Sequence, residues 1–360
     1  MSIDAKNYIH DDDLAALEAL KAIPGFSQLM KAFLKEFSER QGHLRNMSSF
    51  IRIDKDQLPK YAEMLPPICE KLGIEVPELY LMMDVRPNAF TSGETKPYIV
   101  LTSGLLDTLP DELIPTILAH ECGHIACHHV LYRTMGGILL GGTAGTMSRL
   151  PLGSLFTLPL QVAFFYWMRC SEYSADRAAV LCDGGADKMA EVCMRLAGFS
   201  NNINAELNRE AFMNQAKEYR NLIKDSKWDK TMEFYMLANA SHPFMSVRAL
   251  ECTEWAASEQ YRQVLDGTWV VPERKKPEEK PLFDFEELYK KIVPETPKKT
   301  AKAPAGETIC PHCGTANRSG AVYCKNCGKP LEAPEILCPE CGEKLDGTET
   351  FCPQCCHKMK

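Results

Sequence analysis

The sequence predicts an α+β protein with a mainly helical first domain, which contains a small β-sheet, followed by two small cysteine-rich units. Three observations lead to this prediction. Long stretches carry apolar residues three and four positions apart, and two short runs are rich in β-branched, aromatic and aliphatic residues. Nine of the 16 cysteines fall between Cys310 and Cys356. At about 150 residues per domain, a chain of 360 residues suits two or three domains.

The composition excludes several classes of protein. With 45% hydrophobic and 25% charged residues, the chain has a composition typical of a globular protein. Its net charge of −7 lacks the basic footprint of a nucleic-acid binder, so we expect no nucleic-acid partner. The N-terminus shows no basic stretch followed by an apolar one, which indicates a cytoplasmic protein. The seven cysteines outside the tail are then free thiols, mostly buried.

The first domain is predicted to span residues 1–271, with a helical N-terminal part over about 1–75. Apolar residues recur at helical spacing through 12–70, for example at Leu14, Leu17 and Leu20. Residues 78–84 and 97–102 are predicted to be two strands joined by a loop. A helix is predicted from 110 to about 133, although Pro115 leaves its start open.

His120-Glu121-Cys122-Gly123-His124 lies in the middle of that helix and has the pattern H-E-x-x-H. A spacing of four residues places both imidazoles on one helix face, where they can share one Zn²⁺. Glu121 then lies beside the metal as general base for its bound water. Apolar residues give the helix a core face, as a buried site requires: Ile114, Ile117, Leu118, Ile125 and Val130.

The neighbouring metal-binding side chains do not reach the same ion. His128 is eight residues beyond His120, which is about 12 Å along a helix axis. We therefore interpret His128 and His129 as surface or core histidines and exclude the Cys127 thiol on the same grounds.

A catalytic zinc needs a third protein ligand and an open position for water. The pattern H-E-x-x-H-x-x-G-x-x-H is excluded because the required histidine position holds Val130. Glu172 on a later helix fits instead. Asp176, one turn further on, could hydrogen-bond a ligating histidine. An isolated E-x-x-x-D on a helix is also typical of a solvated face, so the spacing alone leaves both interpretations open.

Residues 135–168 form the most apolar stretch of the chain. The 19 uncharged residues of 150–168 approach the length of a membrane span, but Pro151 and Pro159 interrupt them. A single crossing would separate His124 from Glu172. A second crossing over 135–148 would reach only about 21 Å against about 30 Å of hydrocarbon. The stretch is therefore predicted to be buried or to flank the active site, and membrane association is not expected.

The remaining chain is predicted to be helical from 171 to about 261 and to become a linker over 272–308, which contains six prolines. Within the linker, Phe285, Leu288, Tyr289 and Ile292 suit either one short docked helix or a transient helix in a flexible tether.

Two C-x₂-C-x₁₀-C-x₂-C patterns follow, with corresponding cysteines 28 residues apart. They predict two zinc ribbons, over 309–332 and 336–360, each with one structural zinc held by four thiolates. The ligands are Cys310, Cys313, Cys324 and Cys327 in the first and Cys338, Cys341, Cys352 and Cys355 in the second. Four thiolates close the coordination sphere, so we expect a structural or docking role with a protein partner.

Five segments in order resemble the HtpX-like and CAAX-protease-like gluzincin metallopeptidases of peptidase family M48. They lie at residues 87–90, 99–107, 118–125, 171–177 and 241–248, and the resemblance covers about residues 45–255. The tail resembles double zinc-ribbon modules.

The resemblance implies a role for each matching residue. His120, His124 and Glu172 would ligate the catalytic zinc, Glu121 would act as general base and then as proton donor, and Asp176 would support a ligand. His242 and Arg248 would face the cleft, with His242 stabilising the oxyanion. Asn88 and Ala89 would lie at the cleft edge, where an extended substrate can add as a strand.

The sequence thus predicts a zinc-dependent endopeptidase that cleaves extended or unfolded polypeptides and recruits protein through its ribbons. Two alternatives stay open. One is an integral-membrane quality-control protease of the HtpX type, although residues 1–110 lack an 18-residue apolar run, which favours a soluble relative. The other is a non-catalytic zinc-ribbon adaptor, although a pure binder would not need Glu121.

Overall fold

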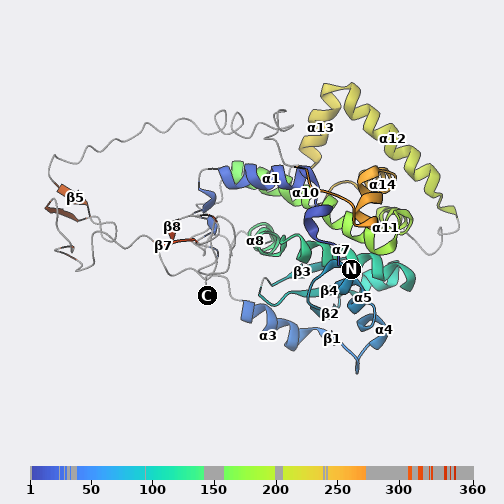
Figure 1. Ribbon diagram of the computed structural model, residues 1–360, viewed down its shortest axis with the longest axis horizontal. Coiled ribbons are helices and arrows are strands. Elements are labelled where there is room, and N and C mark those ends of the chain that lie inside the picture. The colour runs from blue at the N-terminus through green and yellow to red at the C-terminus, as the bar shows by residue number, and fades with distance from the viewer. Residues whose placement is uncertain are drawn as a thin grey trace.

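The computed structural model describes most of the first 272 residues and short stretches of the C-terminal region. The described residues are 2–23, 25–27, 29–30, 33, 39–93, 95–141, 158–198, 206–237, 240, 242–272, 307–309, 315–318, 324, 326, 336–338, 341 and 344–345. They form a mainly helical α+β structure with one four-stranded sheet, which confirms the predicted fold class (Figure 1).

The sheet has the strand order β1-β2-β4-β3. Its strands are β1 (Ile51–Ile53), β2 (Glu78–Met82), β3 (Ala89–Ser92) and β4 (Tyr98–Thr102). β2 and β4 pair in parallel, and the two outer strands pair antiparallel to them. All five residues of β4 are buried, as expected for a central strand. β3 therefore lies at one edge of the described sheet.

Helices surround this sheet. The N-terminal ones are η1 (Ala5–Asn7), α1 (Asp11–Ala22), α3 (Glu39–Ser49), α4 (Pro59–Ala62) and α5 (Leu65–Leu72). The central ones are α6 (Ser103–Thr108), η2 (Asp111–Leu113), α7 (Ile114–Ala126), α8 (Val130–Gly141) and α10 (Leu158–Asp183). The last are α11 (Asp187–Gly198), α12 (Arg209–Asp225), α13 (Lys227–Leu237), α14 (Met245–Ala256) and α15 (Glu259–Asp266).

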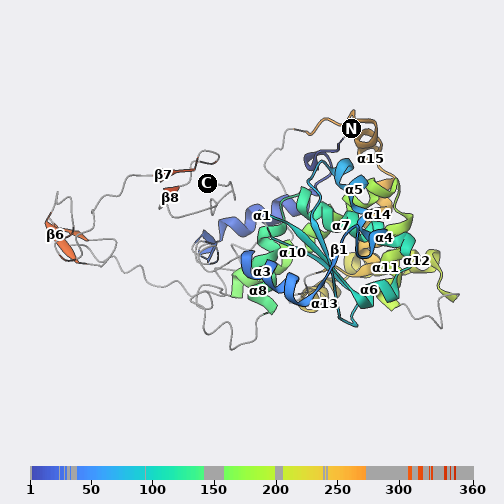
Figure 2. The ribbon, with the colours of Figure 1, turned by 90° about the horizontal axis from the view of Figure 1, so that it is seen from below.

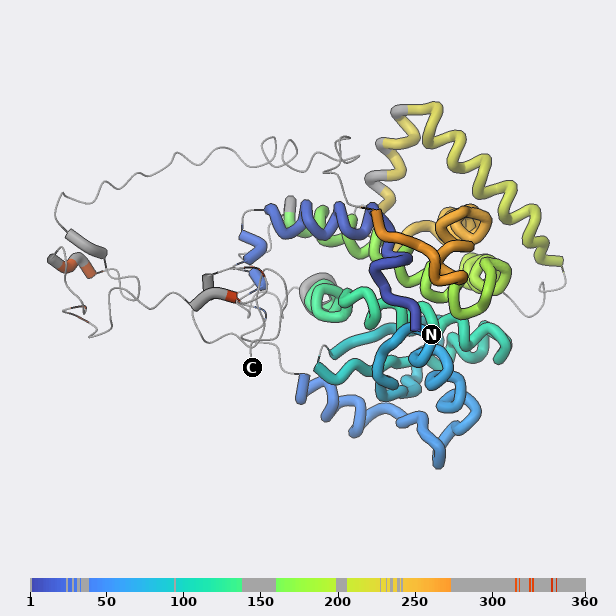
Figure 3. Tube along the Cα trace, viewed as in Figure 1, coloured from blue at the N-terminus to red at the C-terminus, as the bar shows by residue number. Residues whose placement is uncertain are grey.

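α7 lies between the sheet and the long helix α10. It contacts β3 and α5 on one side and packs along α10 on the other, while α1 packs against α10 from outside (Figures 1 and 2). The tube in Figure 3 shows α1 running beside α10, although the two are more than 130 residues apart in the sequence. Residues of α7 and α10 therefore meet in the interior of the domain.

Two apolar clusters hold this arrangement together. The larger cluster joins β2, β4, α5, α7, α11 and α14 with the C-terminal half of α10. The smaller cluster joins α1 and α8 with the N-terminal half of α10 and contains the fully buried Trp167. α10 belongs to both clusters, so burial of its apolar side chains fixes α1 relative to α7.

The prediction of secondary structure was wrong in three places. β1 interrupts the region predicted to be helical over 12–70, and β3 lies in the region predicted to be a loop between two strands. The helix predicted from 110 to about 133 is divided into α7 and α8. His128, between them, has a left-handed backbone with φ of 56°, which an α-helix cannot accommodate.

The apolar stretch at 135–168 is described in part. α8 continues to Gly141, and α10 begins at Leu158 rather than near residue 171. Residues 142–157 lie outside the described part of the chain. Among the described residues, no helix combines the length and the apolar character that a membrane crossing requires.

The C-terminal region contains two short antiparallel hairpins in its described residues. One pairs β5 (Glu307–Ile309) with β6 (Ala316–Arg318), and the other pairs β7 (Ile336–Leu337) with β8 (Lys344–Leu345). Ile336 and Lys344 follow Thr308 and Ala316 by 28 residues, the same offset that relates the cysteine patterns. The predicted linker helix at 285–292 lies outside the described residues, and the domain boundaries stay predictions.

Candidate metal centre

α7 brings the two histidines of the H-E-x-x-H pattern together. The rings of His120 and His124 are 4.9 Å apart between centroids and nearly perpendicular. Both side chains are buried, as is Glu121 between them. Pro115 lies in the first turn of α7, where its missing N–H costs no helical hydrogen bond, so the proline starts the helix rather than disrupting it.

α10 supplies a carboxylate that faces both imidazoles. Glu172 is fully buried, and its Oε2 and Oε1 atoms lie 3.5 Å from His120 Nε2 and His124 Nε2, respectively. One nitrogen or oxygen from each of the three residues lies within 4.8 Å of the others. The structure thus brings together the three residues that the sequence predicts as zinc ligands.

A glycine permits this close approach of the two helices. A Cβ atom on Gly123 would lie 2.7 Å from the Cβ of Ala178 and 3.0 Å from the Cα of Ala175. Carbon atoms are not accommodated at such distances, so α7 and α10 pack this closely only with glycine at position 123. Gly123 stands between the two histidines in the sequence and therefore sets their distance from Glu172.

The three residues fit a catalytic zinc ion. His124 Nε2 is buried, makes no hydrogen bond within the described structure and lies 3.5 Å from Glu172 Oε1. Buried polar atoms of this kind need a partner, and a metal ion supplies one. Two imidazoles and one carboxylate are a known ligand set of catalytic zinc, which keeps a further position open for water.

Asp176 and Arg248 support His120 from behind. Asp176 Oδ1 lies 2.8 Å from His120 Nδ1, and the Arg248 guanidinium donates two hydrogen bonds to Asp176, at 2.9 and 2.6 Å. Burial alone would raise the pKa of Asp176, but the positive charge of Arg248 outweighs it and lowers that pKa. The pair holds an ionised carboxylate against the ring nitrogen that faces away from Glu172.

Arg248 was predicted to face the cleft, and in the structure it lies buried beside the carboxylates of the site. Its side chain, on α14, is buried, with one guanidinium nitrogen 3.4 Å from Glu172 Oε2 and another bonded to Asp176. Arg248 therefore contacts the two carboxylates of the site. A role in positioning Asp176 and Glu172 follows from these contacts, and no open face is available for a substrate.

His242 lies at the more open side of the site. Its side chain is 42% exposed, and its Nε2 is 3.6 Å from Glu172 Oε1. The charge of Glu172 would raise the pKa of His242, but burial of the ring and the charges of Arg133 and Arg248 outweigh it, and the pKa falls to about 4. The imidazole is therefore neutral near pH 7 and can donate one N–H.

Two further side chains of the site were missed by sequence reasoning. Thr91 on β3 donates a hydrogen bond of 2.7 Å to Glu121 Oε2. Arg133 on α8 lies 2.6 Å from Glu172 Oε1 and bonds to Ser171 Oγ at 3.1 Å. Neither belongs to a motif, because both depend on how β3 and α8 pack against α7 and α10. Thr91 lies in Ala89-Phe90-Thr91-Ser92, a segment predicted to be a loop, so no sequence signal marked it.

Asn88 and Ala89 lie at the start of β3. The Asn88 backbone N–H donates to Thr102 Oγ1 at 2.9 Å, and Ala89 pairs with Leu101 of β4. These contacts hold one side of β3 against β4. Within the described sheet, the other side of β3 has no strand partner, and its residue Thr91 touches Glu121.

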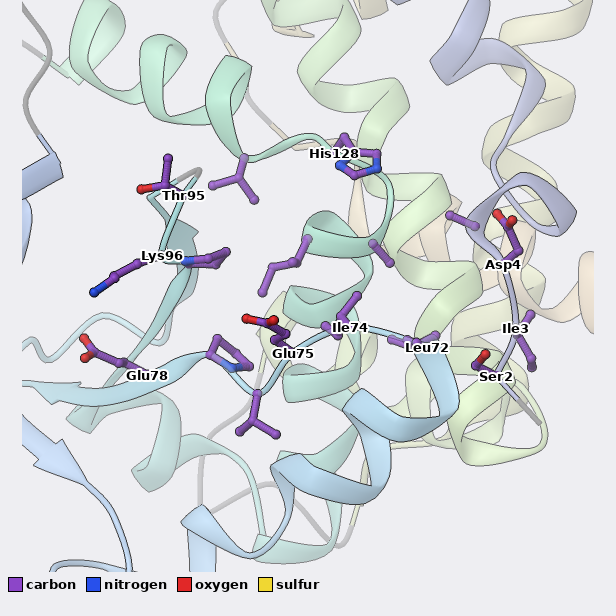
Figure 4. Close-up of a pocket in the computed structure, with 18 residues that line it drawn as sticks. Ser2, Ile3, Asp4, Leu72, Ile74, Glu75, Glu78, Thr95, Lys96 and His128 are labelled. Carbon is purple, nitrogen blue, oxygen red and sulfur yellow. The ribbon is translucent and has the colours of Figure 1, made fainter. Parts of the chain in front are cut away.

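One cavity of the domain lies away from these residues. It has a volume of about 740 Å³ and is lined by the N-terminal segment, the connection from α5 to β2, the turn before β4 and the end of α7. Figure 4 shows His128, Lys96 and Glu75 among its walls. None of His120, His124 and Glu172 lines it, so this cavity is separate from the metal centre.

The described ribbon cysteines are Cys324, Cys338 and Cys341. Cys324 is buried, and its sulfur accepts hydrogen bonds from Asn317 Nδ2 at 3.6 Å and from the Asn326 backbone N–H at 3.4 Å. Donors of this kind are typical around metal-bound thiolates. The other predicted ribbon ligands lie outside the described residues: Cys310, Cys313, Cys327, Cys352 and Cys355.

Comparison with known families agrees with this geometry. The model of peptidase family M48 matches residues 61–256, more than half of the chain, and the model of the double zinc ribbon matches residues 310–356. The chain belongs to peptidase family M48. The resemblance predicted from the sequence is therefore confirmed, and the protein is a zinc metallopeptidase with a C-terminal double zinc ribbon.

Several curated M48 relatives match the chain. The plastoglobule-localized metallopeptidase 48, chloroplastic, of Arabidopsis thaliana is 32% identical over 270 residues, which cover 73% of this chain and 76% of that protein. The protease HtpX homologs of Campylobacter concisus and Sulfurovum sp. are 24% and 23% identical, and each alignment covers 42% of this chain. Those alignments span less than two thirds of the HtpX homologs, 61% and 62%. No solved structure matches the chain.

Proposed function

We propose that this M48 metallopeptidase is an endopeptidase that hydrolyses peptide bonds in extended or unfolded polypeptides. The observation that carries the proposal is the cluster of His120, His124 and Glu172, with Glu121 beside it. A zinc ion held by these three ligands would acidify a water molecule and polarise the scissile carbonyl.

The residues of the chain have separate tasks in this reaction. Glu121 accepts the proton of the attacking water and passes it to the leaving amine. Thr91 holds the carboxylate of Glu121 through its hydrogen bond. His242, neutral and partly exposed, donates its N–H to the oxyanion that develops on the carbonyl oxygen. Asp176 and Arg248 keep His120 oriented.

The side of β3 that has no strand partner within the described sheet supports an extended substrate. A peptide that pairs with this strand would satisfy its backbone hydrogen bonds in the way strand addition does elsewhere. Asn88 and Ala89 would contact the substrate at the start of the strand, and Thr91 places the same strand next to Glu121. An unfolded chain offers extended backbone along its whole length, whereas a folded protein keeps most of its backbone groups paired, which favours unfolded chains.

The ribbons are proposed to bind protein and recruit substrate, with one structural zinc each, while the domain at 1–271 carries the chemistry. We further propose a cytoplasmic location without a nucleic-acid partner. The seven scattered cysteines support a reducing compartment, because each is a free thiol in the structure. The adaptor alternative is disfavoured by Glu121, which a binding protein would not require.

The experiment compares wild type with Glu121→Gln on casein, in the presence of zinc and without detergent. Glu112→Gln, on η2, is the matched control because it removes a carboxylate outside the site. We expect Glu121→Gln to lower the rate of cleavage by about 10²–10⁴-fold while the zinc content of the protein stays unchanged. Equal cleavage by wild type and Glu121→Gln would contradict the assignment of the base.

A further inference from the structure

The second histidine of the pattern has a buried neighbour that the sequence did not indicate. His129 Nδ1 lies 3.0 Å from His124 Nδ1, and the two ring centroids are 5.3 Å apart. Only 1% of His129 is exposed, and its ring packs edge-on against Trp167. His129 was predicted to be a surface or core histidine; it is buried and contacts a candidate ligand directly.

His129 in turn contacts a buried carboxylate from the N-terminal helix. Its Nε2 lies 2.8 Å from Asp13 Oδ2, as a close pair whose N–H is not aligned for a hydrogen bond. Asp13 is 1% exposed although it lies in the first turn of α1. An aspartate rarely occupies such a position unless its charge is paired.

The hydrogen-bond donors around Asp13 determine which ring nitrogen of His129 carries a proton. Trp167 Nε1 can only donate, and it gives a hydrogen bond of 3.0 Å to Asp13 Oδ1. Ser174 Oγ accepts the His10 backbone N–H at 2.9 Å and donates to Asp13 Oδ2 at 2.6 Å. Both oxygens of Asp13 therefore act as acceptors, which requires His129 to carry its proton on Nε2.

The tautomer of His129 in turn determines the tautomer of His124 at the metal site. A His129 ring with its one proton on Nε2 offers Nδ1 as an acceptor, and His124 then donates from Nδ1 across the 3.0 Å contact. The Nε2 lone pair of His124 then faces Glu172. This is the tautomer that a zinc ligand needs.

We propose that Asp13, acting through His129, is a positioning group that fixes the tautomer and orientation of His124 for zinc binding. The proposal rests on the proposed function, because it concerns the same zinc site. It gives each histidine ligand its own carboxylate: Asp176 supports His120 directly, and Asp13 supports His124 through a second imidazole. α1 thereby becomes part of the metal centre.

The test measures the zinc affinity of the full-length chain by competition with a chelator. The reference is Glu172→Ala, so that the zinc bound at this site is the difference between the two proteins. Asp13→Asn keeps the shape of the side chain, but one amide oxygen cannot serve donors on both sides. We expect Asp13→Asn to weaken zinc binding at this site by about 10–100-fold, as removal of groups behind metal ligands does elsewhere.

Two variants of His129 separate positioning from packing. Glutamine can still accept from His124 and donate to Asp13, whereas leucine fills similar space without either function. We expect His129→Leu to weaken zinc binding by about 10–100-fold and His129→Gln to restore most of the affinity. The control is His128→Asn, an exposed neighbour with a left-handed backbone that asparagine tolerates. We expect it to leave zinc binding unchanged.

The outcomes are distinguishable. Zinc affinity within about twofold of wild type in folded Asp13→Asn, or equal loss in His129→Gln and His129→Leu, would overturn the proposal. If Glu172→Ala bound as much zinc as wild type, the metal site of the proposed function would itself be absent. Imidazole ¹H–¹⁵N spectra add a readout independent of activity: we expect the proton of His129 on Nε2 in wild type.

Discussion

Thr91 and Glu121 are joined by a hydrogen bond of 2.7 Å that links the edge strand of the sheet to the catalytic helix. Thr91 is 8% exposed and Glu121 is 5% exposed, so water does not compete freely for this contact. The strand proposed to bind substrate and the residue proposed to move the proton are thus directly connected.

Loss of this hydrogen bond should slow catalysis without removing the metal. Thr91→Val keeps the shape of the side chain but leaves Glu121 without its donor, at a cost of about 1–2 kcal/mol. We expect kcat to fall about tenfold with unchanged zinc content, while Thr91→Ser, which retains the hydroxyl, stays close to wild type. Steady-state cleavage of a short quenched peptide measures this, and an unchanged kcat in Thr91→Val would argue against the role of Thr91.

Gly123→Ala should disturb the metal centre through packing alone. The new methyl group would meet Ala178 at 2.7 Å, so α7 must move away from α10 and from Glu172. We expect a loss of about 1–3 kcal/mol of stability together with weaker zinc binding. Gly137→Ala in α8 is the matched control, since nothing lies within 4 Å of its added Cβ.

The same contact permits a rescue experiment. Ala178→Gly removes the methyl group that Gly123→Ala would strike. We expect the double variant to recover part of the lost zinc binding, because the Ala175 backbone stays at 3.0 Å, and thermal unfolding to show that the two substitutions are not additive. Purely additive effects would mean that this contact does not set the spacing of the helices.

Acid should destabilise the domain through His10. Its burial, followed by the charge of Arg177, lowers the pKa of His10 to about 4 despite nearby Asp13. Between about pH 6.5 and 4 the unfolded chain binds a proton that the folded protein does not, so stability falls as pH falls, by up to about 1.4 kcal/mol per pH unit.

His10→Asn tests this dependence, because asparagine can still cap α1. We expect the variant to lose less stability than wild type between pH 6.5 and 4 in denaturant titrations, although other groups also titrate there. The control is His43→Asn, whose side chain is 51% exposed. Parallel pH profiles for wild type and His10→Asn would contradict the prediction.

Metal analysis should separate the three predicted zinc sites. We expect three zinc ions per metal-replete wild-type chain and two in Glu172→Ala, because the latter loses one ligand of the buried cluster. Cys324→Ser and Cys338→Ser, one in each ribbon, should each lose one zinc and keep cleavage of a short peptide. Elemental analysis that finds one or two ions in the intact, replete wild type would be inconsistent with this count.

The sequence predicted those parts of the site that depend on local spacing. The pitch of one helix relates His120, Glu121 and His124. Glu172 and Asp176 lie one turn apart on another helix, but the resemblance to family M48, rather than this spacing, indicated their roles. The fold class followed from the same periodicities. The 28-residue repeat of the tail likewise requires no knowledge of tertiary structure.

The rest depended on contacts between distant segments. Asp13 and His129 are 116 residues apart and meet only because α1 packs on α10. His129 was interpreted as a surface or core residue, which its burial supports, but its contact with His124 needs the left-handed turn at His128. β1 and β3 are too short to be predicted as strands from their sequences alone, and they form strands by pairing with β2 and β4.

Gly123 and Ala178 together leave room for one methyl group where α7 crosses α10. The space between the two helices therefore limits the combined volume of the two side chains, and natural selection acts on that combined volume. Among homologous metallopeptidases with this helix crossing, we expect the two positions to covary: a larger residue at one should accompany a smaller residue at the other.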